Sequence, residues 1–281
     1  MKKFTFFAIM IAALTLGFQF SSTAQTLLEE NFDYPANDLI TAHGWSAHSG
    51  AASQPITVGA PGLTFPGYLS SGIGNAAFAD NNGEDDHKIF PVQTAGTVYT
   101  SFMVNVTTAT TGYFFHFGGN PIGTTFRGKV FMNSTNHFGV SVGSNTGTYA
   151  AATFTPGTTY LLVAKYEIVA GINNDKVSLF IFDGTIPLTE PAATIGPLTE
   201  ATPEINPASV AIRQFTPLTG QPIQNVTVDG IRVATTWSDL LVPPPAPIPT
   251  ASEWGLIFMF VALLSIGAIY IMRRRNSELS V

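Results

Sequence analysis

Residues 160–182 read YLLVAKYEIVAGINNDKVSLFIF, and this stretch decides the fold. Its first half places an apolar or aromatic side chain at every second position: Tyr160, Leu162, Ala164, Tyr166 and Ile168. Because successive side chains of a strand point to opposite faces, this spacing predicts a strand with one buried and one wet face. The Gly171–Asp175 stretch supplies turn residues, so residues 160–169 and 176–182 are predicted to form a β-hairpin.

The same period-two spacing recurs through the middle of the chain. Phe102, Val104 and Val106 share one face of a predicted strand. No window of ten or more residues between 26 and 241 shows a sustained helical stripe of apolar residues. The region 26–241 is therefore predicted to be all-β, with about a dozen short strands separated by Gly, Pro and Asn turns.

The last predicted strand, residues 225–236, changes parity in its middle. Val226 and Val228 fall on one face by simple alternation, whereas Ile231 and Val233 fall on the other. A β-bulge at Asp229 would bring all four apolar side chains inward. We also expect this strand to pair with the first one, residues 27–32, because that pairing removes two sheet edges.

Composition excludes some classes of partner. Charged residues make up 11% of the chain, against roughly 25% in average soluble domains. Residues 25–247 carry seven Lys or Arg and sixteen Asp or Glu, with no basic patch in the sequence. Nucleic acid is therefore not expected as a partner. The chain has no Cys, so disulfides contribute nothing to its stability.

The N-terminus is typical of a secretory signal peptide. Lys2 and Lys3 precede an apolar run over residues 4–20, and small residues stand at Ser22 and Ala24. We expect residues 1–24 to be a signal helix that is removed on export. The protein is then located at the cell surface or in the extracellular matrix.

The C-terminus has the features of a membrane anchor. Residues 242–249 contain five prolines and predict a semi-rigid polyproline spacer. Residues 256–272 are uncharged and predict a short transmembrane helix. A basic cluster follows at once and is expected to stay on the cytoplasmic side: it consists of Arg273, Arg274 and Arg275.

The segment 248–281 resembles a bacterial sorting signal of the IPTLxxWG type. The matching residues are Ile248, Pro249, Thr250, Trp254 and Gly255, while Ala251 replaces the Leu of the pattern. This resemblance implies that an exosortase-type membrane enzyme processes the tail. A plain C-terminal anchor is the alternative.

The rest of the chain resembles the concanavalin A-like (laminin-G-like) jelly rolls of bacterial surface proteins. The resemblance depends on three segments, ENFDYP at 30–35, NNDKVSL at 173–179 and VDGIRV at 228–233. It implies a two-sheet antiparallel jelly-roll sandwich over residues 26–241. Such folds include lectins, glycosidases, adhesion modules and spacers, so the resemblance concerns architecture rather than activity.

The sequence shows no recognisable catalytic pattern. Retaining glycosidases need two carboxylates about 5 Å apart, and no strand carries Glu or Asp at matching spacing. The five histidines, at positions 43, 48, 87, 116 and 137, lack metal-ligand spacing. We therefore expect a non-catalytic binding or structural protein and not an enzyme. The alternative is a carbohydrate-active enzyme, a glycosidase or a lyase.

Calcium is the one cofactor that the sequence favours, because loop carboxylates suit it. One candidate site uses Asp33 and Asp229, which approach each other if the terminal strands pair. The second lies in an acidic loop and uses Asp80, Asn82, Glu84 and Asp86. For both groups the alternative is an ordinary turn or solvated charge.

Aromatic side chains suggest a ligand surface. Simple alternation places Tyr113 and Phe115 on one strand face, and Trp45 is a further candidate. Exposed rings of this kind stack on sugars, so a polysaccharide is an expected partner, together with other surface proteins. Packing in the core is the alternative for these rings.

Overall fold

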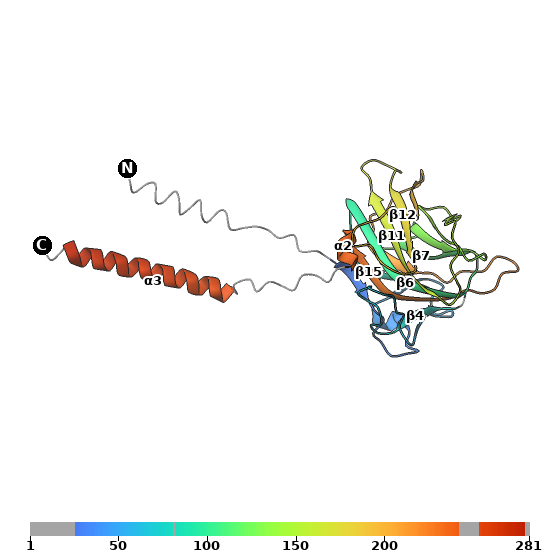
Figure 1. The fold of residues 1–281 in the computed structure, drawn as a ribbon, viewed down its shortest axis with the longest axis horizontal. Coiled ribbons are helices and arrows are strands. Elements are labelled where there is room, and N and C mark those ends of the chain that lie inside the picture. Colours follow the sequence, from blue (N-terminus) through green and yellow to red (C-terminus); the bar gives the residue numbers. More distant parts are fainter. Residues whose placement is uncertain (1–25, 81, 242–252, 279–281) are drawn as a thin grey trace. The chain divides into compact units, whose positions relative to one another are not determined.

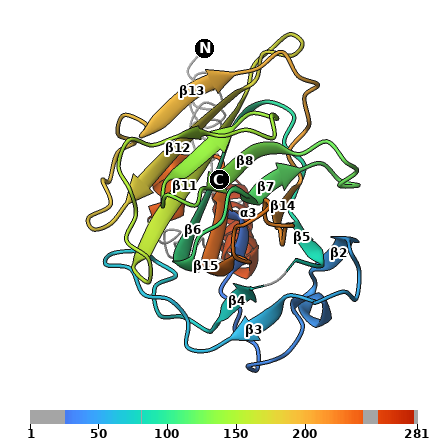
Figure 2. The ribbon, with the colours of Figure 1, turned by 90° about the vertical axis from the view of Figure 1, so that its right-hand side faces the viewer.

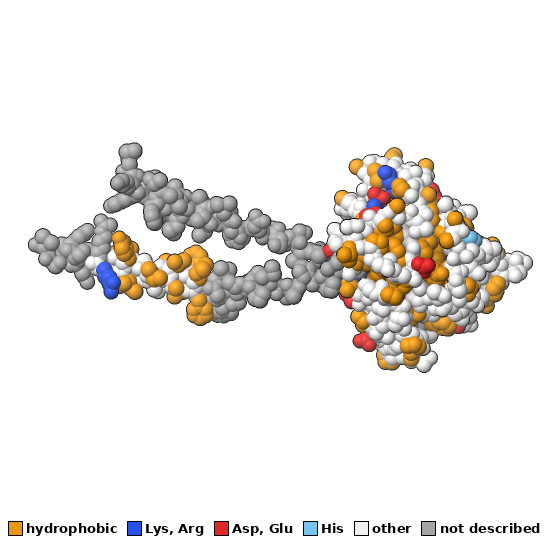
Figure 3. Space-filling model, in the orientation of Figure 1, with side chains coloured by type: hydrophobic (Ala, Val, Ile, Leu, Met, Phe, Trp, Pro, Cys, Tyr) orange, Lys and Arg blue, Asp and Glu red, His pale blue; other side chains and the backbone are white. Residues whose placement is uncertain are grey.

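The computed structural model describes residues 26–80, 82–241 and 253–278. The chain divides into two compact units, residues 1–244 and 245–281. The first unit contains all the strands, and Figure 1 labels some of them. Charged side chains are sparse on the face of this unit that Figure 3 shows, as the composition leads one to expect.

The first unit is a sandwich of two antiparallel sheets (Figure 2). The eight-stranded sheet has the spatial order β13 (Ile195–Thr199), β12 (Lys176–Phe182), β11 (Thr159–Ile168), β6 (Gly96–Thr108), β15 (Asn225–Ala234), β4 (Ala76–Ala79) and β3 (Thr57–Gly59), with β1 (Thr26–Glu30) paired to β15. The seven-stranded sheet has the order β10 (Thr148–Tyr149), β9 (Phe138–Ser141), β8 (Arg127–Met132), β7 (Gly112–Gly118), β14 (Ser209–Ile212), β5 (Asp85–Ile89) and β2 (Ser46–Ser49). The prediction of an all-β two-sheet sandwich is thus confirmed.

The local predictions for the eight-stranded sheet hold as well. Strands β11 and β12 form the expected antiparallel hairpin. The register between β15 and β6 shifts between Asp229 and Arg232, and Gly230 has a positive φ of 58°. This bulge keeps the valines and the isoleucine of β15 in the core. Strands β1 and β15 pair, so the two ends of the domain close together.

The main core lies between the two sheets. It takes alternate side chains from both, among them Phe102 of β6 and Val130 of β8, both fully buried. A second apolar cluster covers the other face of the eight-stranded sheet, where α2 (Trp237–Leu241) packs its Trp237 ring against Phe180. The eight-stranded sheet is therefore covered on both faces. A short 3-10 helix, η1 (Ile40–His43), leads into β2.

The second unit contains α3 (Glu253–Glu278), a longer helix than the predicted 256–272. Among the described residues no helix is both long and apolar enough to cross a membrane. The transmembrane prediction is therefore not supported. The predicted signal helix (1–24), the proline spacer (242–249) and the sorting residues 248–252 lie outside the described residues.

Candidate active site

One face of the seven-stranded sheet points away from the core, and we call it the outward face. Val130 and Met132 of β8 are core residues, so alternation sends Lys129 and Phe131 to the outward face. By the same rule Ile212 of β14 is a core residue, and the next residue, Arg213, points outward. The polar chemistry of the domain gathers on this face.

The strand order lays chemically distinct side chains across the whole outward face. In spatial order these are His48 on β2, Asp85 and His87 on β5, Arg213 after β14, Tyr113 and His116 on β7, Lys129 and Phe131 on β8, and Tyr149 on β10. Figure 2 shows β2, β5, β14, β7 and β8 in one layer. With neighbouring strands about 4.8 Å apart, six strand spacings span about 29 Å. A face of this width suits an extended chain better than a small molecule.

Tyr113 lies at the centre of this face between two cations. The Arg213 guanidinium carbon is 4.1 Å from the centroid of its ring, and the Lys129 ammonium is 4.8 Å from it. The Tyr113 hydroxyl makes no hydrogen bond to any described residue. Burial raises the pKa of this phenol, and nearby Arg213 partly offsets that effect. Tyr113 therefore keeps its proton at neutral pH and can donate it.

Lys129 is a buried cation with a fixed direction. Only 6% of it is exposed, and its ammonium donates to the Gly143 carbonyl and to Asn145 Oδ1, both at 2.8 Å. Burial and the nearby Arg127 and Arg213 lower its pKa to about 8. The ammonium is thus charged at neutral pH and loses its proton in mildly alkaline solution.

Three imidazoles come together beside Tyr113. The ring centroids of His48 and His87 are 5.3 Å apart, and those of His48 and His116 are 5.8 Å apart. Burial lowers the pKa of all three histidines, that of His48 to about 4. All three rings are therefore neutral at pH 7. Among the described residues no group of three or more His, Cys, Asp or Glu is arranged to hold a metal ion.

His116 has a defined tautomer. It is fully buried, its Nδ1 lies 3.1 Å from the Phe117 carbonyl oxygen, and only a protonated Nδ1 can donate to that acceptor. Its Nε2 then carries the free lone pair, and this atom has no partner among the described residues. The ring of Phe126 stacks over the imidazole at 4.2 Å. The free lone pair of His116 is therefore buried beneath an aromatic cover.

Carboxylates are almost absent from this face. Asp85 and Asp86 are the only acidic residues in the described strands of the seven-stranded sheet, and alternation turns only Asp85 outward. Asp85 accepts a hydrogen bond from the Gln214 backbone N–H at 2.8 Å, and one of its oxygens is 3.7 Å from Arg213 Nε. Burial raises its pKa to about 6. Asp85 therefore serves as the counterion of Arg213.

Of the three aromatic residues proposed as ligand contacts, the structure leaves only Tyr113 on the outward face. Phe115 is fully buried and stacks on Phe102 at 4.2 Å, inside the core. The cause is a register shift between β7 and β8, which puts Tyr113 and Phe115 on opposite faces despite their even spacing. Phe131 and Tyr149 extend the aromatic surface beside Tyr113 instead.

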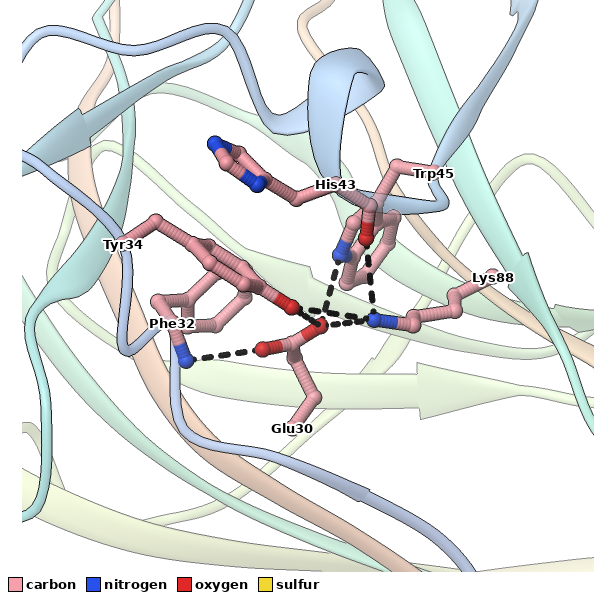
Figure 4. Close-up of polar contacts among 6 residues, drawn as sticks. All are labelled: Glu30, Phe32, Tyr34, His43, Trp45 and Lys88. Atoms are coloured by element: carbon pink, nitrogen blue, oxygen red, sulfur yellow. Dashed lines mark hydrogen bonds and ion pairs between the residues drawn. The ribbon is translucent and has the colours of Figure 1, made fainter.

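Trp45 is also buried and belongs to a structural cluster, drawn in Figure 4. Its indole N–H donates to Glu30 Oε2 at 3.1 Å. The same carboxylate accepts from the Tyr34 hydroxyl at 3.1 Å and from the Phe32 backbone N–H at 2.8 Å, and it pairs with Lys88. A ring held in this way cannot stack on a sugar.

The first pair of predicted calcium ligands, Asp33 and Asp229, differs in exposure. Asp33 is exposed. Asp229 is fully buried and its oxygens accept the backbone N–H groups of Leu63 and Gly230, at 2.7 and 2.6 Å. Burial raises the pKa of Asp229 to about 7. Calcium binding by this pair stays a prediction.

The second calcium candidate is less solvated than its sequence suggests. Glu84 and Asp86 are buried, and Glu84 accepts the backbone N–H of Ala52. Asn82 is exposed and its Oδ1 accepts the Thr216 hydroxyl at 3.0 Å, whereas Asp80 lies before β5. Calcium binding here also stays a prediction.

Most residues of the outward face are not predicted from the sequence. His48, His87 and His116 are scattered along the chain without metal-ligand spacing, and no motif contains Lys129 or Arg213. The signal that could have found Lys129 is a charged residue at an alternate position of an otherwise apolar strand, RGKVFM at 127–132. Nothing in the sequence places β14 between β7 and β5, so the neighbours of Arg213 were not predictable.

The fold that carries this face is an all-β sandwich of two antiparallel sheets, consistent with a jelly roll. No family model matches the chain, and no curated protein does. Among solved structures it is similar to the cellulose-induced protein Cip1, with 13% identity and a TM-score of 0.46 over 74% of this chain and 97% of that one. It is also similar to alginate lyase Aly36B, with 12% identity and a TM-score of 0.44 over 74% of this chain and 96% of that one. A third similar structure is an endo-1,3-beta-glucanase from Streptomyces sioyaensis, with 12% identity and a TM-score of 0.45 over 75% of this chain and 96% of that one.

These findings correct the expectation of a non-catalytic binding or structural protein. The similar solved structures include carbohydrate-active enzymes, a lyase and a glucanase. The ground for the expectation also fails, because the fold gathers acid, base and cationic side chains that the sequence leaves far apart. Identities this low concern the fold alone, so the reaction must be inferred from the outward face.

Proposed function

We propose that the protein is a carbohydrate-active enzyme that cleaves an acidic polysaccharide by β-elimination on the outward face. The observation that carries this proposal is the position of Tyr113, a protonated acid between the cations of Arg213 and Lys129. A uronate chain supplies the carboxylate that such cations bind. The neighbouring neutral imidazoles supply a base.

The reaction needs three groups, and the face offers each of them. Arg213 and Lys129 bind the uronate carboxylate and stabilise the negative charge that develops on it. A base, for which the partly exposed imidazole of His87 is the candidate, removes the proton from the carbon next to that carboxylate. The electron pair forms a carbon–carbon double bond, the bond to the leaving glycosidic oxygen breaks, and Tyr113 gives that oxygen its proton.

The pairing of the basic residues supports an anionic substrate. Away from this face, Lys88, Lys165 and Arg232 each have a glutamate partner within 4 Å. On the face, Lys129 donates only to a carbonyl and an amide oxygen. Arg213 of the same face pairs with Asp85 at 3.7 Å, whereas the ammonium of Lys129 has no carboxylate partner and can attract a polyanion.

Two-carboxylate hydrolysis fits this face less well. Glycosidases of that mechanism use a carboxylic acid and a second carboxylate about 5 to 9.5 Å apart. In the described strands of the seven-stranded sheet, Asp85 is the only outward carboxylate, and it pairs with Arg213. Elimination needs no carboxylate, so the side chains present suffice for it.

The test is incubation of the full chain with uronate polymers and, separately, with a neutral β-glucan. We expect new ultraviolet absorbance from an unsaturated uronate end with an acidic polymer only. Tyr113→Phe should abolish it, whereas Lys176→Met, on the eight-stranded sheet, should not change it. Release of reducing ends without unsaturated product, or turnover of the neutral glucan alone, would refute the proposal.

We further propose that the chain is exported and that an exosortase-type enzyme processes its tail. Support comes from the sequence, with its signal-peptide pattern and the Pro249-Thr250 and Trp254-Gly255 pairs. Polysaccharides occur outside the cell, so export agrees with the proposed substrate.

A further inference from the structure

A carboxylate outside the seven-stranded sheet holds the turn to which Lys129 is bound. This turn joins β9 to β10 and comprises residues 142–147; we call it the β9–β10 turn. Glu200 directly follows β13, an edge strand of the eight-stranded sheet. Its carboxylate accepts three successive backbone N–H groups of the turn, from Val142 at 3.2 Å, Gly143 at 2.9 Å and Ser144 at 2.8 Å.

The same turn presents the acceptors of Lys129. The Gly143 carbonyl and Asn145 Oδ1 each accept from its ammonium at 2.8 Å. The peptide group between Gly143 and Ser144 thus gives its N–H, that of Ser144, to Glu200 and its carbonyl, that of Gly143, to Lys129. An N–H group that is bound to an anion polarises its peptide, so the two hydrogen bonds support each other.

Arg127 fixes the other side of the turn. A Cβ at Gly143 would lie 2.8 Å from Arg127 Nη1, so the guanidinium packs directly on the turn backbone. Arg127 itself donates to the carbonyls of Pro203, at 2.6 Å, and Phe126, at 2.7 Å. The turn therefore lies between Arg127 and Glu200, and a side chain at 143 would have to displace the guanidinium.

We propose that Glu200 is a positioning residue for Lys129, acting through the β9–β10 turn. It fixes the direction of the ammonium and, as an anion, also favours its charged form. The charged groups near Lys129 are Arg127, Arg213 and Glu200, and only Glu200 raises the pKa of Lys129. The consequence for catalysis depends on the proposed function, whereas the link to Lys129 does not.

The test compares Glu200→Gln with a matched control in the full chain. Glu204 lies four residues further on and accepts one backbone N–H, that of Asn174 at 2.7 Å, in a different turn. Glu204→Gln therefore makes the same change of charge and size away from Lys129. The side-chain ammonium of Lys129 is followed by ¹⁵N NMR, and its signal among the six lysines is assigned by its loss in Lys129→Arg.

For Glu200→Gln we expect the Lys129 titration to move to lower pH and the amide signals of Gly143 and Ser144 to shift. Glu204→Gln should leave both unchanged. Turnover of a uronate polymer at pH 8 should fall about tenfold in the first variant only, as for a misdirected catalytic group. If Glu200→Gln is indistinguishable from Glu204→Gln in the NMR measurements, the inference is wrong.

The two proposals fail in different ways. A chain that is inactive on uronates but shows the Lys129 shift refutes the lyase proposal and keeps the positioning role. Activity on uronates without the Lys129 shift supports the lyase proposal and refutes the positioning role. If Glu200→Gln folds poorly, Glu200→Asp is the substitute, because it keeps the charge and shortens the side chain. In that variant the NMR signal of the Gly143 amide should shift, while the pKa of Lys129 should stay near its value in the parent chain. If the Gly143 amide signal does not shift, the inference is wrong.

Discussion

The charge of a single buried amine should limit the pH range of the proposed lyase activity. Burial lowers the pKa of Lys129 to about 8, so its positive charge is complete below that pH and is lost as the pH rises through it. We expect turnover of an acidic polymer to fall above pH 8. Tyr113, whose pKa is raised, keeps its proton in this range.

Two substitutions test this pH limit. Lys129→Arg keeps a cation that does not titrate, so the alkaline fall should disappear even if the rate is lower. Lys129→Met should reduce kcat/KM at pH 7 by about a hundredfold, as expected for the loss of a charge-stabilising group. The measurement is the pH profile of kcat/KM. A fall at pH 8 that persists in Lys129→Arg would assign the limit to another group.

At the scale of one strand, the bulge in β7 places Phe115 in the core and Tyr113 on the outward face. Phe115→Ala empties a fully buried site and should cost about 4 kcal/mol of unfolding free energy. Tyr113→Phe removes one hydroxyl on the outward face and should change stability by less than about 0.5 kcal/mol while abolishing turnover. Urea unfolding and activity assays of both variants measure this. Equal losses of stability would contradict the assigned faces.

The cluster of Figure 4 joins the two sheets. Glu30 belongs to β1 of the eight-stranded sheet and Lys88 to β5 of the other, and Glu30 is only 3% exposed. Lys88→Met leaves a buried carboxylate without its cation and should cost about 3 kcal/mol. The double variant with Glu30→Gln should recover part of that loss. Thermal or urea unfolding measures both.

A matched control exists in the ion pair of Lys165 with Glu190, which is more open to water. Lys165→Met should cost about 1 kcal/mol or less. If Lys88→Met is as mild as this control, the pair between the sheets is not a source of stability.

Elements could be predicted from the sequence where their cause is local. The β11–β12 hairpin follows from alternation plus a Gly and Asn turn, and the β15 bulge follows from the parity change at Asp229. The β7 bulge could not be predicted, because it depends on how β7 pairs with β8. At this bulge β7 advances by two residues, from Tyr113 to Phe115, while the paired position on β8 moves by one, from Phe131 to Val130.

The site could be predicted only in part because it depends on strand order. His48, His87 and His116 come from β2, β5 and β7, and β14, from residues 209–212, lies between β5 and β7. Long-range pairing of this kind leaves no trace in local spacing. Tyr113 was found because aromatic rows are visible in a sequence, whereas its partners Arg213 and Lys129 depend on the fold.

At the scale of the whole molecule, the open question is the fate of the tail. The order of features in the sequence is a proline spacer, the 248–255 motif, an apolar run and then three arginines. An anchor alone would need no motif, so we expect the tail to be cut near the motif after export. Intact-mass analysis of the mature protein from its native host should give a C-terminus between residues 249 and 255.

Substitutions in the motif separate sorting from anchoring. Replacing Pro249 and Trp254 together should leave uncut precursor, because the processing enzyme would no longer recognise the motif. Ile257→Leu keeps the apolar character of the segment and should not change the mature mass. A mature mass that retains residues 256–281 in the parent chain would show that the tail is never removed.

Ala251, which replaces the Leu of the pattern, allows a sharper comparison. Ala251→Leu should increase the fraction of cleaved protein if the processing enzyme recognises the motif itself. It should leave that fraction unchanged if cleavage depends only on the apolar run.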